Sequence, residues 1–418
     1  MLQPVGVGNK ALADYTHLVG RTLIKEIKGH AEQLKGLRVL HLSATAFGGG
    51  VAEILYTLVP LMRDVGIDAE WHVLFGKEEF FNTTKIMHNA LQGNPQDLTD
   101  EEWEIWERYN EINAEQLSKD WDVVIVHDPQ PAAIRSLVPD NAKSWIWRCH
   151  IDLSTPNPGT IERLGPYLPD YDGTVFHLQD YVPPVLMNGD NRQPYICPPA
   201  IDPLSPKNMA LSPEDAAFVC DQFGIDVNRP LLCQVSRFDP WKDPMGVIDA
   251  YKLVTQKIPQ VQLALVGSMA TDDPEGWDFL TQTMAYAQGD PDIKILNNLN
   301  NVGAIEVNAF QSQADIAIQK STREGFGLTV SEALWKVRPF IGGDVGGIPL
   351  QVKNGETGYL VSSPEECAQR SIEVLEQPEL GKQLARAGKE HVRQHFLTPR
   401  LLRDWLGIFR DVSTTSPP

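Results

Sequence analysis

The chain has 418 residues, of which 42% are hydrophobic and 22% charged, an ordinary composition for a globular protein. That length exceeds one hydrophobic core, so we expect two or more domains. The formal net charge of −19 disfavours nucleic acid and anionic membrane surfaces as partners. It does not exclude a nucleotide ligand, which helix dipoles and a few cations can hold.

The cysteines and the N-terminus indicate the compartment. The five cysteines include no Cys-x-x-Cys pair, and most lie in apolar surroundings, so we expect buried, reduced thiols. The first residues lack the features of a secretory signal, and no apolar run reaches the roughly 18 residues of a membrane span. We therefore expect a cytoplasmic protein. The sequence leaves open whether it forms a homodimer.

The first half begins with a helical stripe over residues 10–34, followed by a strand over 37–43. The loop Ala44–Gly50 contains three consecutive glycines and precedes a second helical pattern, Val51–Met62. Strand, glycine loop and helix form the phosphate-binding arrangement of a doubly wound α/β unit. Because the loop does not read Gly-x-Gly-x-x-Gly, it is no dinucleotide fingerprint. The alternative to a phosphate-binding loop is that these glycines form a tight turn that binds no ligand.

Further strands and helices alternate along the first half, which favours a parallel sheet covered on both faces. Residues 100–118 predict a helix whose aromatic side chains (Trp103, Trp106 and Tyr109) we expect to pack in the core. The predicted strands are 70–75, 122–127, 144–149, 173–178 and 194–197.

A proline-rich segment, Cys197–Pro206, interrupts this rhythm and marks a linker. We place a first domain at 1–200 and a second at 201–396. The last helix, Pro399–Val412, has an apolar face with nothing left to cover in the second domain, so residues 397–418 should dock on the first. Strands of the second half are predicted at 230–236, 261–266, 293–296, 315–318 and 338–341, and helices at 246–257, 274–288, 302–313, 328–336, 364–375 and 379–394.

Two doubly wound α/β domains predict a cleft between the carboxyl ends of their strands, where such sheets bind ligands. The stretch Gln319–Trp335 supplies a strand end, a glycine turn and a helix start, which together form an anion site. Glu324 precedes the turn and Glu332 lies within the helix. A phosphate site between two carboxylates indicates a ligand with both phosphate and sugar hydroxyls.

Two cations follow the first strand of the second domain. Arg237 and Lys242 lie at its carboxyl end and could bind a diphosphate. The Arg237 guanidinium could donate two parallel hydrogen bonds, and the Lys242 ammonium could act as a point charge. The alternative is a pair of solvated charges matched by Asp239 and Asp243.

Polar residues also end two strands of the first domain. His127 and Asp128 follow one strand, and His150 and Asp152 follow the next. A lone histidine is usually structural, but two polar strand ends on one edge favour a substrate pocket. We predict no metal site, because the Asp-x-Asp pairs precede strands and no His/Cys group has zinc spacing. P-loop and nucleophile-elbow motifs do not occur.

These motifs resemble the retaining glycosyltransferases of family four. The resemblance rests on Ser236-Arg-x-x-x-x-Lys-Asp, Glu324-Gly-Phe-Gly-Leu with Glu332, the loop 342–349 and Asn354-Gly-x-x-Gly-Tyr-Leu-Val, in that family's order. It implies the two-domain B-type glycosyltransferase fold and catalysis without a metal or other cofactor, with a nucleotide-sugar as the donor substrate.

The resemblance also implies roles by position. Arg237 and Lys242 would hold the diphosphate, Glu324 the donor sugar and Glu332 the ribose, and His150 would lie near the anomeric carbon. The amides of Gly325, Phe326, Gly327 and Leu328 would bind phosphate, while Gly49 and Gly50 would close over the donor. Leu299, in the loop 297–301, would lie on the base side, although the sequence does not identify the base.

A narrower resemblance concerns the first domain. Thr45-Ala-Phe-Gly-Gly-Gly-Val-Ala-Glu, Val126-His-Asp-Pro-Gln-Pro and Trp147-Arg-Cys-His-Ile-Asp-Leu-Ser look like trehalose glycosyltransferring synthases. It implies transfer of glucose from UDP-, ADP- or GDP-glucose to free glucose, with His127, Asp128 and Asp152 on the acceptor side. A trehalose phosphorylase, a nucleotide-sugar epimerase and a non-catalytic nucleotide-sugar sensor are the alternatives.

Overall fold

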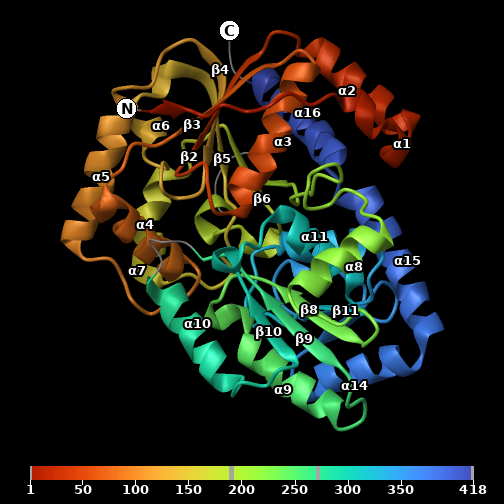
Figure 1. Ribbon diagram of the computed structural model, residues 1–418. Coiled ribbons are helices and arrows are strands. Elements are labelled where there is room, and N and C mark those ends of the chain that lie inside the picture. Colours follow the sequence, from red (N-terminus) through yellow and green to blue (C-terminus); the bar gives the residue numbers. More distant parts are fainter. Residues whose placement is uncertain (1, 188–192, 270–273, 416–418) are drawn as a thin grey trace. The chain divides into compact units, whose positions relative to one another are not determined.

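The computed structural model describes residues 2–187, 193–269 and 274–415. The chain folds into two compact units, each with its own sheet (Figure 1). Unit 1 contains Met1–Pro199 together with Thr398–Pro418, and unit 2 contains Ala200–Leu397. Among the described residues, every helix is too short or too polar to cross a lipid bilayer.

The sheet of unit 1 has the strand order β1-β3-β2-β4-β5-β6-β7. Its strands pair in parallel, as predicted, except that β1 pairs antiparallel with β3. The two residues of β1 are too few to show a periodic pattern, and the sequence did not predict this strand. The strands are β1 (Gln3–Pro4), β2 (Arg38–Ser43), β3 (Asp68–Val73), β4 (Trp121–His127), β5 (Ala142–Arg148), β6 (Gly173–Phe176) and β7 (Tyr195–Ile196).

The helices of unit 1 require one correction. The single helix predicted over residues 10–34 is wrong, because Gly20 adopts a φ of +83° and separates α1 (Thr16–Val19) from α2 (Arg21–Gln33). A short 3-10 turn, Leu12–Tyr15, precedes α1. The other α-helices are α3 (Gly50–Asp64), α4 (Glu78–Leu91), α5 (Asp100–Ala114), α6 (Ile134–Leu137), α7 (Pro158–Leu164) and α16 (Thr398–Thr415).

Helix α16 returns to unit 1 as predicted and packs against α2 and α3 (Figure 1). The buried Arg400 fixes the start of this helix. Its Nη2 donates to the backbone carbonyls of Pro198 and Pro199, each at 2.8 Å. The end of the first segment of unit 1 is therefore bonded to the start of the second.

Unit 2 has an entirely parallel sheet with the order β10-β9-β8-β11-β12-β13. Its last strand, β13, was not predicted. The strands are β8 (Leu231–Val235), β9 (Gln262–Val266), β10 (Ile293–Leu296), β11 (Ile316–Gln319), β12 (Phe340–Gly343) and β13 (Tyr359–Val361). The α-helices are α8 (Pro213–Gln222), α9 (Pro244–Thr255), α10 (Pro274–Tyr286), α11 (Ala304–Gln313), α12 (Leu328–Trp335), α13 (Ile348–Gln351), α14 (Pro364–Glu376) and α15 (Pro378–His395).

Both sheets reverse their strand order once. In unit 1 the chain goes from β2 to β3 on one side, and β4 then pairs on the other side of β2. In unit 2 the strands β9 and β10 extend on one side of β8, and β11 pairs on the other. Ligands of doubly wound sheets bind outside the carboxyl ends of the strands at such a reversal. Each unit therefore has one expected ligand position.

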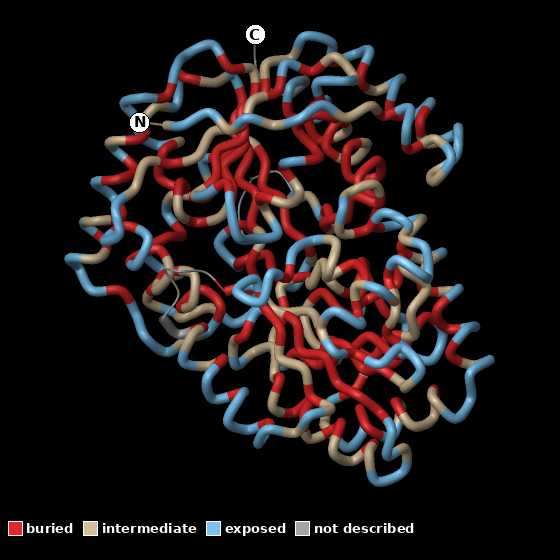
Figure 2. The backbone as a smooth tube through the Cα atoms, viewed as in Figure 1, coloured by how far each residue is buried: buried red, intermediate tan, exposed pale blue. Residues whose placement is uncertain are grey.

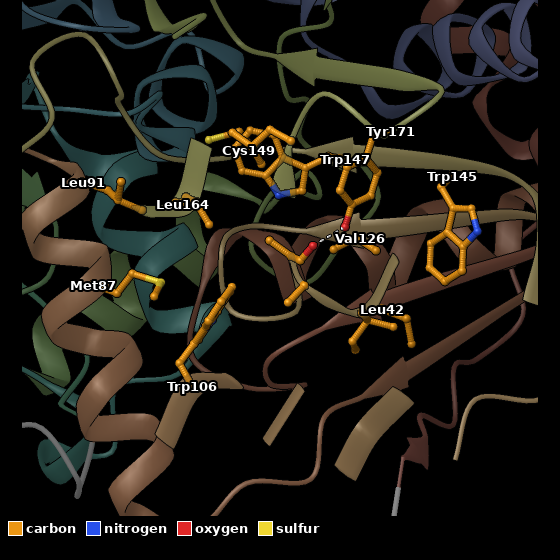
Figure 3. Close-up of a cluster of buried hydrophobic side chains, with 14 of the residues drawn as sticks. Leu42, Met87, Leu91, Trp106, Val126, Trp145, Trp147, Cys149, Leu164 and Tyr171 are labelled. Atoms are coloured by element: carbon orange, nitrogen blue, oxygen red, sulfur yellow. Dashed lines mark hydrogen bonds between the residues drawn. The ribbon is translucent and has the colours of Figure 1, made fainter. Parts of the chain in front are cut away.

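The strands form the buried centre of both units (Figure 2). On one face of the unit 1 sheet, Leu42, Val126 and Trp147 join a large apolar cluster (Figure 3). The aromatic residues of α5 lie in this cluster, which confirms their predicted role in packing. All five cysteines are buried and free of disulfides, also as predicted.

The docking of α16 should depend on its buried aromatic side chains. Phe409 has no exposed surface, and its ring lies 5.6 Å from that of Trp405. We expect Phe409→Ala to lower the free energy of unfolding by about 3–5 kcal/mol through lost burial and a residual cavity. Urea denaturation followed by circular dichroism measures this change.

The matched control for Phe409→Ala is Phe218→Ala, since Phe218 lies on α8 with 67% of its surface exposed. It should change the midpoint of denaturation little. Equal effects of the two substitutions would contradict a buried, stabilising position for Phe409.

Candidate active site

The strand reversal of unit 2 brings two charged loops together. One loop follows β8 and contains Arg237 and Lys242, and the other follows β11 and runs from Lys320 to Gly327. Because β8 and β11 are parallel neighbours, with Gln234 paired to Ile318, both loops leave the sheet at the same edge.

An ion pair joins these loops. Nζ of Lys242 lies 2.7 Å from Oε2 of the buried Glu324, and the hydroxyl of Ser321 donates to the same oxygen at 3.2 Å. Two side-chain interactions hold the segment of Lys242 in place. The amide of Gln234 donates to its carbonyl at 3.0 Å, and the carboxylate of Asp239 accepts from its backbone N–H at 3.2 Å. Lys242, which is predicted to bind the diphosphate, therefore directly contacts Glu324, which is predicted to bind the sugar.

A second ion pair lies beside the first and joins the buried Lys320 to Asp243. Asp243 has a φ of +48° and also caps α9, where its carboxylate accepts from the backbone N–H of Gly246 at 3.0 Å. Lys320 was not predicted from the sequence as a residue of the site. Its position directly after a buried strand at the reversal is the signal that could have indicated it.

These contacts bear on the alternative interpretation, in which Arg237 and Lys242 are paired with Asp239 and Asp243. Asp243 was the alternative partner of Lys242, and this pairing is wrong, because Asp243 binds Lys320 instead. The pairing of Arg237 with Asp239 is confirmed at 3.2 Å, but the Arg237 side chain is 59% exposed. An ion pair so exposed is weak, so the guanidinium can exchange this partner for a ligand.

The glycine turn is held by a second glycine loop. Gly327 adopts a φ of +79° and begins α12, whose first N–H groups point out of the helix end. A Cβ atom on Gly347 would lie 2.6 Å from Cα of Phe326, so only glycine allows this approach. The side-chain amide of Gln351 then donates to the carbonyl of Phe326 at 2.6 Å. The turn from Gly325 to Leu328 is thus fixed in place.

Glu332 lies one turn into α12 and has no exposed surface. Its Oε1 lies 2.9 Å from Nζ of Lys207, a residue that the sequence analysis did not single out. Leu299 lies in the turn after the edge strand β10 and is 59% exposed. Both residues are therefore at the carboxyl edge of the unit 2 sheet, but Glu332 is covered and Leu299 is open.

The strand reversal of unit 1 carries the other predicted residues. Gly49 caps α3 and Gly50 begins it, after a loop in which Gly48 has a φ of +72° and Phe47 is 78% exposed. At the end of the neighbouring β4, His127 is buried, and its Nδ1 lies 2.8 Å from Nε2 of the partly exposed His150. His127 thus lies behind His150.

Two carboxylates shape the loop that carries His150. Asp128 has a φ of +65°, and its Oδ1 accepts from the backbone N–H of His150 at 2.6 Å. Asp152 is buried, and its Oδ1 accepts from the N–H and the hydroxyl of Ser154 at 2.8 and 2.5 Å. Within residues 2–187, 193–269 and 274–415, no group of three or more His, Cys, Asp or Glu side chains is arranged to hold a metal ion.

Solved structures support the fold, and a match to a sequence family supports the general class of the protein. Sucrose-phosphate synthase from Thermosynechococcus elongatus superposes with a TM-score of 0.66 at 16% identity, over 91% of this chain and all of that one. The trehalose-phosphate synthase from Burkholderia xenovorans gives 0.71 at 13% identity, over 90% and 99% of the two chains. Residues 218–391 match the family of glycosyl transferases group 1. The chain is a group 1 glycosyltransferase with the B-type fold predicted from its motifs.

Residues 41–183 further match the trehalose synthase N-terminal domain. Trehalose synthase from Rubrobacter xylanophilus is 57% identical over 98% of this chain and 99% of its own. The Pyrococcus horikoshii trehalose synthase is 46% identical over 97% of both chains. A trehalose phosphorylase from Pleurotus pulmonarius is 28% identical and covers 85% of this chain. The chain belongs to the trehalose synthase family.

Asp128 gives a prediction for the dependence of stability on pH. Burial raises its pKa to about 7, although the N–H of His150 and the charge of Arg148 act in the opposite direction. In the unfolded chain this carboxyl loses its proton near pH 4. As the pH rises from about 4 to about 7, the folded state keeps a proton that the unfolded state releases, so stability falls.

Asp128→Asn removes this titration and suits the positive φ, since asparagine tolerates that conformation. We expect the wild type to lose up to about 4 kcal/mol of unfolding free energy relative to Asp128→Asn between about pH 4 and pH 8. Chemical denaturation across this pH range measures the difference. A constant difference between the two proteins would show that Asp128 has an ordinary pKa.

Proposed function

We propose that this glycosyltransferase moves glucose from a nucleotide-glucose to free glucose, with retention at the anomeric carbon, and so forms α,α-trehalose. The observation that carries the proposal is the ion pair of Lys242 with Glu324 at the strand reversal of unit 2. In this pair a cation that could bind phosphate lies 2.7 Å from a carboxylate that could accept hydrogen bonds from sugar hydroxyls. Membership of the trehalose synthase family supports the choice of product.

The diphosphate of the donor would be held by unit 2. Arg237 and Lys242 supply the positive charge, and the amides of the turn Gly325–Leu328 supply N–H donors at a helix start. Lys320 remains paired with Asp243 and keeps that carboxylate from repelling the phosphates. The protein itself thus supplies the charge that holds the diphosphate, and the proposal includes no cofactor besides the donor.

The nucleoside would extend along the same edge of the sheet. Glu332 would accept hydrogen bonds from the ribose hydroxyls, and Leu299 would contact the base. Because Lys207 is paired with Oε1 of Glu332 at 2.9 Å, a ribose hydroxyl that binds this oxygen would compete with the Lys207 side chain. The donor would therefore replace one partner of Glu332 by another.

The chemistry follows from where charge develops. The bond between the anomeric carbon and the phosphate oxygen breaks, which leaves positive charge on the sugar and negative charge on the departing nucleotide. Lys242 and Arg237 stabilise the latter. The acceptor hydroxyl attacks from the face that the phosphate leaves, and its proton passes to a phosphate oxygen. Retention results because both events use one face.

Unit 1 would supply the acceptor side, together with the loop that closes over the donor. His150 is partly exposed at the carboxyl edge of the sheet, and Asp128 holds its backbone. Asp152 orders the following turn. His127, predicted as an acceptor ligand, would act through His150, and Gly49 and Gly50 belong to the closing loop.

A product assay tests the proposed function. UDP-, ADP- and GDP-glucose are each incubated with glucose, and trehalose is detected by NMR. We expect trehalose from at least one donor, and none when glucose is omitted. Trehalose and phosphate from glucose 1-phosphate plus glucose, without any nucleotide-glucose, would identify a phosphorylase, and a changed donor sugar without acceptor would identify an epimerase. Binding of every donor without any product would indicate a sensor.

Removing the cation at the diphosphate should slow transfer. We expect Lys242→Met to lower kcat/KM by about 100-fold to 1,000-fold, the usual effect of losing one group that stabilises the leaving charge. Steady-state kinetics with the active donor measures this loss. Lys257→Met is the control, since Lys257 is an exposed cation after α9 and should have no effect. Unchanged kinetics of Lys242→Met would remove Lys242 from the site.

A further inference from the structure

Three histidines of unit 1 are hydrogen-bonded end to end. Nδ1 of His41 lies 2.9 Å from Nε2 of His127, and Nδ1 of His127 lies 2.8 Å from Nε2 of His150. The ring planes differ by only 24° and 21° within the two pairs. A fourth histidine, His177, meets the ring of His150 edge-on at 5.5 Å.

The register of the sheet arranges His41, His127 and His150 in one line, which we call the histidine line. His41 on β2 pairs with Ile125 of β4, so His127 lies two residues further towards the carboxyl edge. His127 in turn pairs with Arg148 of β5, and His150 lies two residues beyond it. A shift of two residues keeps side chains on one face of a sheet. The histidines therefore cross adjacent strands diagonally, from the buried interior to the carboxyl edge.

The three imidazoles are neutral at neutral pH. Burial lowers the pKa of His41 to about 3, and burial also holds the pKa values of His127 and His150 well below the usual range. The buried Arg148 beside them adds a positive charge that further opposes protonation of His127 and His150. Each ring thus carries one N–H, and each hydrogen bond of the line needs one donor and one acceptor.

Two directions of donation are possible, and the inner end distinguishes them. Among the described residues, Nε2 of the buried His41 has no hydrogen-bond partner, and the ring of Trp405 lies at 76° to that of His41 with the ring centroids 6.3 Å apart. If donation ran inwards from His150, Nε2 of His41 would carry an unpaired N–H in the interior. If it runs outwards from His41, the same atom is an unpaired acceptor. Buried unpaired donors are the rarer of the two, so donation runs outwards.

We propose that His41 and His127 are positioning residues that hold His150 in the tautomer with its proton on Nδ1. Nε2 of His150 accepts from His127 and is thereby occupied. Nδ1 then presents an N–H that can donate to a hydroxyl oxygen of the sugar. The role of His150 in transfer rests on the proposed function, whereas its tautomer does not.

The first test reads the tautomer directly in the unaltered protein. Long-range ¹H–¹⁵N NMR spectra of the histidine-labelled chain distinguish protonated from bare ring nitrogens, and His150→Gln identifies the signals of His150. We expect the proton on Nδ1 of His150 and a bare Nε2. A proton on Nε2 would overturn the proposal, whether or not the chain transfers glucose.

The second test separates positioning from packing. In His41→Asn the side-chain amide nitrogen stands near the place of Nδ1 and can still donate, while His41→Leu has no donor. We expect His41→Leu to lower kcat by about 10-fold to 100-fold, as for other partners that orient a functional histidine, with the donor KM changed by less than about twofold. His41→Asn should recover most of the activity.

The NMR spectrum of His41→Leu should also show His150 in a mixture of tautomers. The control is His17→Leu, since His17 is an exposed histidine that should change neither kcat nor the spectrum. Wild-type kcat in His41→Leu together with an unchanged tautomer of His150 would overturn the proposal. If the wild type makes no trehalose while His150 still carries its proton on Nδ1, the proposed function fails and the assigned tautomer stands.

Discussion

The parallel pairing of β8 with β11 is the constraint on which the candidate donor site depends. It fixes two loops far apart in the sequence at one edge of the sheet, with Gln234 beside Ile318. Because the strand order reverses between these strands, their helices leave to opposite sides and the edge stays uncovered. Lys242 and Glu324 can therefore meet at 2.7 Å although 82 residues separate them. The same constraint acts on β2 and β4 in unit 1, where it positions the glycine loop beside His127.

Charge compensation is the second condition for such a site. Lys320 is buried and Lys242 nearly so, and each is matched by a carboxylate, Asp243 and Glu324 respectively. An unpaired buried charge would be costly, so each cation is held by a carboxylate of the protein itself. In the proposed donor complex, a diphosphate would take over part of the interaction with Lys242, and its sugar would take over part of that with Glu324. Ligand binding would then exchange charges already present in the site.

The periodicity of apolar residues and the positions of glycines allowed most of the fold to be predicted from the sequence. Strands with strong apolar runs, such as β4 and β9, were predicted within about one residue because burial on both faces requires such runs. Gly20 defeated the prediction of one long helix, since its φ of +83° depends on the fold and not on the apolar stripe. The strands β1 and β13 were missed because two or three residues show no period.

The residues of the candidate site could be predicted only in part from the sequence. Motifs indicated Lys242 and Glu324, but their partners come from pairing between distant segments, and no sequence spacing reveals that Asp243 binds Lys320. Lys207 shows the same limit, since it lies in the segment after the proline-rich linker and yet covers Glu332. His41 was predicted only as part of a strand. A single histidine in an apolar run does not reveal that it has a hydrogen-bonding partner, His127, on the neighbouring strand.

The histidine line follows from a general property of neutral imidazole. Each ring has one donor and one acceptor, so a buried row of rings passes one orientation along its whole length. Such a row must end inside the protein at one end, and there an unused lone pair costs less than an unused N–H. The apolar surroundings of Nε2 in His41 thereby determine which nitrogen of His150 carries the proton at the other end. Burial at one position of β2 thus sets the chemistry two strands away.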